Sequence, residues 1–160
     1  AERQGRACVE LEPRDGWGWH AVAHVFEMRH QPREGVAWLA PNATTWATES
    51  FLAVHNHWHL ALFHLELGEL DAVLRLYDGA IGGTGSSLVL ELIDRSAMLW
   101  RLMLRGAELG GRWEALAQRW AAVGGAGRYA FNDLHAAMAY VGAGRAAELG
   151  ALLEAQREAM

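Results

Sequence analysis

The 160-residue chain is 52% hydrophobic and 21% charged, which is typical of a globular protein with one core rather than a disordered chain. All 14 basic residues are arginines scattered among 19 acidic ones, and the formal net charge is −5. Nucleic-acid binding needs a clustered basic surface, and crossing a bilayer needs an apolar run of about 18 residues. The sequence has neither, so we expect no nucleic-acid partner and no membrane association.

The amino terminus suggests where the protein resides and how the chain begins. "AERQGRACVE" has no apolar signal core, and the single cysteine, Cys8, has no partner for an intrachain disulfide. We therefore expect a cytoplasmic protein. The first residue is not Met, and "RACVELEPRD" resembles the end of a helix followed by Pro13. We expect residues 1–160 to form a single helical repeat domain, as a fragment of a longer chain.

A repeat runs through the chain from the first tryptophans to the carboxyl terminus. Gly68, Gly106 and Gly144 follow one another at intervals of 38 residues, and one further step back lands on His30. Around each position two helices of period near 3.6 are joined by a short turn. The pattern is clearest in residues 18–40, 57–81, 94–120 and 134–156, which lie within the four copies, and glycine-rich loops are expected at 81–87 and 124–127.

The fold predicted from this repeat is all-α. No segment shows the sustained two-residue alternation of a strand. In the second copy Leu60, Ala61, Gly68, Tyr77 and Ala80 fall where a tetratricopeptide repeat (TPR) places its packing residues. The sequence thus predicts a right-handed α-solenoid of about four TPR-like hairpins, whose concave groove would serve for binding.

The first copy carries a candidate metal motif. His20, His24 and Glu27 stand at i, i+4 and i+7 on one helical face. Two imidazoles at i and i+4 can bind one zinc ion. A third ligand could come from His55 or His59, because the first helices of adjacent copies lie about 10 Å apart and their side chains can meet. Ala21 stands where the zinc-protease helix has its glutamate. A polar network of hydrogen bonds is the structural alternative.

The second copy contains "HNHWH", residues 55–59, which divides between two opposite faces of a helix. His55 and Glu66 point towards the groove with His59 at the edge of that face. His57 and His64 lie on the packing face, where we expect structural histidines with one hydrogen-bond partner each.

The fourth copy brings Asn132, Asp133 and His135 together in "AFNDLHAAMAY". Asn132 or Asp133 is expected to cap the helix by accepting free amide hydrogens of its first turn. The alternative places His135 along the groove, with Asp133 or Asp94 orienting a neighbouring side chain.

The eight tryptophans are mostly expected in the core between helices, because an indole buries a large area. Trp58 and Trp100 occupy groove-facing positions of the repeat. They are therefore the candidates for contacting a ligand.

Four motifs, "WHAVAHVFEM" (19–28), "HNHWHLALFHLELGE" (55–69), "YDGAI" (77–81) and "YAFNDLHAAMAYV" (129–141), together resemble the tetratricopeptide repeat protein 38 family. The resemblance implies an all-helical repeat fold in a longer protein. It brings no reaction with it. The positions that match the family pattern are His20, His24, Glu27, His55, Asn56, Trp58, His59, Asp94, Asn132, Asp133 and His135.

Two functional hypotheses follow. In the first, the His-rich concave groove binds a peptide or protein partner through Trp58, Trp100 and charged groups at its rim. In the second, the His/Asp/Asn cluster forms an enzyme active site or binds a small molecule or a metal such as zinc. The repeat fold favours the first hypothesis, and neither motif nor spacing identifies a catalytic residue.

Overall fold

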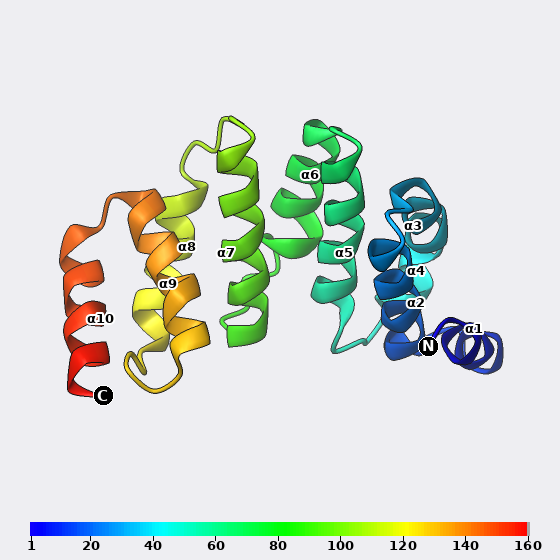
Figure 1. Ribbon diagram of the computed structural model, residues 1–160, viewed down its shortest axis with the longest axis horizontal. Helices are drawn as coiled ribbons and strands as arrows, with labels where there is room; N and C mark the ends of the chain where they lie inside the picture. The colour runs from blue at the N-terminus through cyan, green and yellow to red at the C-terminus, as the bar shows by residue number, and fades with distance from the viewer. Residues whose placement is uncertain (160) are drawn as a thin grey trace. The chain divides into compact units, whose positions relative to one another are not determined.

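The computed structural model describes residues 1–159, which consist of helices and turns without a strand (Figure 1). This confirms the predicted all-α class. The chain divides into two compact units, a first unit of residues 1–84 and a second unit from Gly85 onward. Between residues 1 and 159, no helix is long and apolar enough to cross a membrane.

The first unit contains six α-helices and two short irregular turns. These are α1 (Glu2–Leu11), α2 (Gly16–Met28), α3 (Pro32–Leu39), a 3-10 turn (Ala40–Asn42), α4 (Ala43–Trp46), α5 (Ala53–Glu66), α6 (Leu70–Leu76) and a π-helical turn (Tyr77–Ile81). Helix α2 begins where the Asp15 side chain accepts a hydrogen bond from the Trp17 amide, and α3 begins at Pro32, a residue suited to the first helical position. Helix α2 packs against α1, α3 and α5, so it lies at the centre of the first unit.

The core of the first unit is built on the inner face of α2. Trp19, Val22 and Phe26 recur at helical spacing, and they pack with Trp46 and Phe63 from later elements. Burying each such side chain stabilises the fold by about 1.5–3 kcal/mol. The Trp46 indole N–H donates to the Leu39 carbonyl at 2.9 Å, so its polar atom is satisfied inside the core.

The second unit contains four α-helices: α7 (Val89–Leu104), α8 (Arg112–Val123), α9 (Ala130–Ala143) and α10 (Ala146–Glu158). Helix α9 packs against the other three, and the Trp120 indole N–H donates to Ser96 Oγ at 2.9 Å in the interior. The loop predicted at 124–127 lies between α8 and α9. The loop predicted at 81–87 begins one residue late, because Ile81 still belongs to the π-helical turn.

The four positions of the 38-residue repeat share one backbone conformation. His30, Gly68, Gly106 and Gly144 have φ angles of 51°, 75°, 74° and 68°, in the left-handed region that favours glycine. The predicted turns are therefore confirmed at all four positions. His30 adopts this conformation although it carries a side chain.

The same hydrogen bond closes each of these turns. The residue after the left-handed position donates its amide to the carbonyl five residues earlier, as Gln31 does to Phe26 (2.9 Å) and Arg145 does to Tyr140 (2.8 Å). This is the Schellman motif, which satisfies carbonyls at a helix end and reverses the chain. The repeat seen in the sequence is thus a repeat of helix ends.

Candidate metal centre

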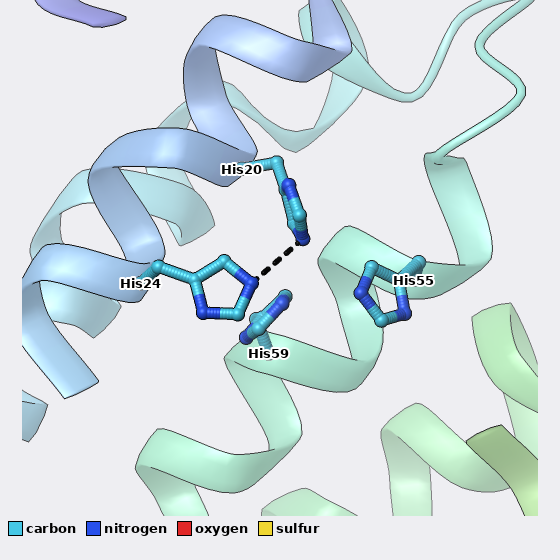
Figure 2. A group of neighbouring side chains, drawn as sticks. All are labelled: His20, His24, His55 and His59. Atoms are coloured by element: carbon cyan, nitrogen blue, oxygen red, sulfur yellow. Dashed lines mark hydrogen bonds between the residues drawn. The ribbon is translucent and has the colours of Figure 1, made fainter. Parts of the chain in front are cut away.

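Helices α2 and α5 each present a pair of histidines to the other. His20 and His24 project from α2, His55 and His59 project from α5, and the four rings converge in Figure 2. One nitrogen from each ring lies within 4.8 Å of the others. Both pairs are spaced i, i+4, so each helix places two rings on one face. The sequence-based expectation that the two copies meet through these residues is confirmed.

The two rings on α2 contact each other directly. The Nε2 atoms of His20 and His24 are 3.0 Å apart, with the rings edge to face. Burial, and then the three neighbouring imidazoles, lower the pKa of His20 to about 3. Burial, and then the nearby His59 ring, also lower the pKa of His24. Both side chains are therefore neutral at physiological pH, the state in which an imidazole can bind a metal ion.

His59 is the buried member of the cluster. The sequence placed it at the edge of the groove face, yet it is 0% exposed because α2 packs over this part of α5. Its Nδ1–H donates to Glu27 Oε1 at 2.6 Å, since a carboxylate offers only acceptor atoms. In a neutral ring the lone pair then lies on Nε2, and this buried atom has no hydrogen-bond partner within residues 1–159.

Glu27 serves both helices. Its Oε1 holds His59 on α5, and its Oε2 lies 3.9 Å from Nδ1 of His24 on its own helix. The Glu27 carboxylate thus lies next to the Nδ1 atom of one histidine from each helix. A carboxylate bonded to the second ring nitrogen of a metal-binding histidine fixes its tautomer and orientation.

Aromatic rings border the cluster. Trp58 stacks on His55 with ring centroids 5.5 Å apart and an interplanar angle of 9°. Trp17 meets His20 edge-on at 5.8 Å and is 62% exposed, although most tryptophans were expected in the core. Trp100, the other predicted ligand contact, belongs to the second unit and packs edge-on against Trp113.

Asn56, next to His55 on α5, links this helix to α2. It is fully buried, and its Nδ2 donates to the Gly16 carbonyl at 3.0 Å, which ties α5 to the start of α2. Its Oδ1 has no hydrogen-bond partner in the described part of the chain. Asn56 therefore holds the two helices together.

The other histidines of α5 behave as predicted for packing residues. His57 donates from Nδ1 to the Ala53 carbonyl at 2.8 Å and lies against Trp46. His64 donates from Nδ1 to Glu69 Oε2 at 2.6 Å. Glu66, expected to face the groove, is exposed at the end of α5.

The remaining predicted site residues lie in the second unit. Asp94 is buried on α7. The capping role expected of Asn132 or Asp133 is wrong, because α9 already begins at Ala130 and Tyr129 occupies the N-cap position without a side-chain bond. Asp133 Oδ2 instead accepts the Gly127 amide at 3.0 Å and a short hydrogen bond from Gln156.

His135 is also buried on α9. Its Nδ1–H donates to the Phe131 carbonyl at 2.7 Å, one turn earlier, and its ring lies against the Phe131 ring.

The sequence did not predict Gln156 or Gly127 as partners of Asp133, because nothing in the local pattern around either residue indicates this contact.

A search of protein-family models finds no match to the chain, and no solved structure matches it significantly. The geometry of the site is therefore the basis for a functional assignment.

Proposed function

We propose that the protein binds a late transition-metal ion, with zinc as the first candidate, between helices α2 and α5. The ligands would be His20, His24, His55 and His59. The observation that carries the proposal is the fully buried Nε2 of His59, which has no partner within residues 1–159 while Nδ1 is held by Glu27. A metal ion among the four rings would use that lone pair.

A purely structural network accounts for these contacts less well. Two neutral imidazoles can share one hydrogen bond, as His20 and His24 do, but the lone pair of His59 then remains buried and unused. A buried acceptor left without a donor costs about 1–3 kcal/mol. The same lone pair becomes a metal–ligand bond when an ion is present.

The donor set indicates the class of metal. Imidazole nitrogens suit zinc, copper, nickel and iron, whereas calcium and magnesium prefer oxygen ligands. In a tetrahedral zinc site the ligand nitrogens are about 3.3 Å apart, as follows from Zn–N bonds of about 2.0–2.1 Å. The present separations, from 3.0 Å for His20 and His24 up to 4.8 Å, need only small rotations of the rings to reach that geometry.

The site is reachable from one side. His59 is closed off, but the His24 side chain is 52% exposed. A metal ion can therefore enter the site while α2 and α5 stay packed together. The same opening would admit a water molecule if three histidines rather than four bound the ion, which is the arrangement of catalytic zinc sites.

The finer description of the fold, a right-handed solenoid of TPR-like hairpins akin to the tetratricopeptide repeat protein 38 family, is part of this proposal. The four Schellman turns at 38-residue intervals support it. A peptide or protein partner is the second candidate function. Its support is Trp17, a large exposed ring beside His20, because exposed aromatic side chains are frequent anchors of partners.

The decisive experiment is a zinc titration of untagged, chelator-treated protein by calorimetry, with elemental mass spectrometry of the loaded sample. We expect close to one equivalent of bound zinc, lost in a His20→Ala/His24→Ala variant. The matched control is His30→Asn/His64→Gln, which also removes two histidines but leaves the cluster intact. No metal uptake by the native chain, or equal loss in both variants, would reject the proposal.

A further inference from the structure

The second unit contains a cavity that the metal proposal does not use. It has a volume of about 650 Å³ and lies among helices α8, α9 and α10, with Val89 at the start of α7. This volume is within the range of about 300–1,000 Å³ that is usual for sites of small organic ligands.

Asp133 contributes an unengaged acceptor to this cavity. It is only 7% exposed, and both of its hydrogen bonds, from Gly127 and from Gln156, go to Oδ2. Within residues 1–159, Oδ1 therefore receives no donor. This oxygen is available as an acceptor to a ligand in the cavity, and a charged donor binds a carboxylate oxygen most strongly.

Tyr140 lines the same cavity two helical turns along α9 from Asp133. It is also 7% exposed. Burial, and then the negative charge of Glu148, raise the pKa of the Tyr140 hydroxyl, whereas the Arg145 guanidinium acts in the opposite sense. The hydroxyl therefore stays neutral, and Tyr140 adds an uncharged aromatic ring to the wall.

Part of the remaining wall is apolar, although Asn132, Glu148 and Arg128 also line it. Trp120 uses its indole N–H for Ser96, so it offers only its ring surface to the cavity, and Val89 and Leu152 add aliphatic surface. An aromatic face beside a carboxylate is the surroundings in which proteins bind organic ammonium groups. Arg128 also borders the cavity, but it is exposed, so solvent screens its charge.

We propose that this cavity binds a small organic amine, in which a primary ammonium group is carried on an apolar or aromatic body. The ammonium donates to Asp133 Oδ1, and the body rests against Trp120, Leu152 and the ring of Tyr140. This ligand supplies the charged N–H donor that Asp133 Oδ1 is without.

The test uses the full chain and tryptamine as the probe, with its neutral relative N-acetyltryptamine as the ligand control, both titrated by calorimetry. Tryptamine is expected to bind saturably with at least a tenfold advantage over N-acetyltryptamine, because only the former brings a charged donor. Equal affinities, or no saturable binding of tryptamine, would overturn the proposal.

Variants locate the binding. Ala151→Leu fills part of the cavity from the exposed face of α10 and is expected to weaken tryptamine binding at least tenfold. Its matched control is Ala147→Leu, the same change on α10 outside the cavity wall, which should leave binding unchanged. Equal behaviour of the two variants would place the amine elsewhere.

The carboxylate is tested separately by Asp133→Asn, with thermal melts to confirm folding. This variant is expected to lower the affinity for tryptamine about tenfold while leaving that for N-acetyltryptamine nearly unchanged. If Asp133→Asn proves unfolded because the tie to Gly127 is lost, the comparison of the two ligands and the Ala151 pair still decide. Full affinity in a folded Asp133→Asn variant, or in Ala151→Leu, contradicts the assignment.

Discussion

The carboxylate of Glu27 and the imidazole of His59 meet at 2.6 Å across two helices, although 32 residues separate them in the chain. This contact joins α2 to α5 and determines which nitrogen of His59 faces the other three rings. Because Glu27 also lies 3.9 Å from His24, its charge acts on both helices. It is the residue through which the cluster can be weakened without removing a ligand.

The first prediction therefore concerns Glu27→Gln. Glutamine can still accept the Nδ1 hydrogen bond, so the fold is preserved, but the charge that strengthens the imidazole as a ligand is gone. We expect zinc affinity to fall about 10- to 100-fold, the usual effect of losing such a partner, as measured by calorimetric titration. Glu66→Gln removes an exposed carboxylate from the end of α5 and should bind zinc as the native chain does.

The second prediction is that zinc stabilises the first unit, because its ligands come from two helices that separate on unfolding. At a free zinc concentration 100 times the dissociation constant, the free energy of unfolding should rise by about 2.7 kcal/mol. Urea titrations with and without zinc measure it. The His20→Ala/His24→Ala variant should show no zinc-dependent change; a similar gain in that variant would mean that zinc binds elsewhere.

Much of this site is predictable from sequence, because spacing alone determines it. The i, i+4 pairs place two rings on one helical face, and the 38-residue interval brings the two faces into neighbouring copies. The burial of His59 is not predictable in this way. It depends on how closely α2 covers α5, and a helical projection of a single segment carries no information on that distance.

The role of Asp133 is another feature that the sequence did not predict correctly. An acidic residue shortly after a glycine-rich loop is typical of a helix cap, and the prediction was wrong because the helix begins three residues earlier, at Ala130. The side chain then points back to the Gly127 amide and across to Gln156. Partners that come from a loop and from the last helix become visible only when the second unit is assembled.

The third prediction concerns the repeated turns. His30 holds φ at 51° with a side chain present, which is unfavourable for a non-glycine residue, so His30→Gly should raise the free energy of unfolding by up to about 1 kcal/mol. Gly106→Ala should lower it by about 1–2 kcal/mol for the same reason. A methyl group at Gly106 would meet no atom within 4 Å, so the loss is one of backbone conformation alone.

A control separates this effect from the general consequences of replacing glycine. Gly150 lies inside α10 without a positive φ, and a methyl group there also meets no atom within 4 Å. Gly150→Ala should therefore stabilise the protein by about 0.5–1 kcal/mol. Urea unfolding of the three variants should give opposite signs for the two glycine replacements; the same sign for both would rule out the turn argument.

The fourth prediction is a pH dependence in the second unit. Glu114 on α8 accepts hydrogen bonds from Arg145, at the start of α10, at 2.5 and 3.1 Å. The Arg145 guanidinium, and then Gln118, lower the pKa of Glu114 from its ordinary 4.5 to about 2. A carboxyl group whose pKa is lower in the folded state stabilises the protein above pH 4.5, and this contribution is lost as the pH falls towards 2.

The measurement compares native protein with Glu114→Gln in urea titrations at several pH values between 7 and 2. The native chain should be the more stable of the two at pH 7, and the difference should stay constant down to about pH 5 and then shrink through the window from 4.5 to 2. Glu108→Gln, an exposed acid outside this pair, should give no such pH-dependent difference. A gap that persists unchanged to pH 2 would mean that Glu114 acts through the shape of its side chain, because a charge-dependent contact between α8 and α10 cannot survive protonation of the carboxylate.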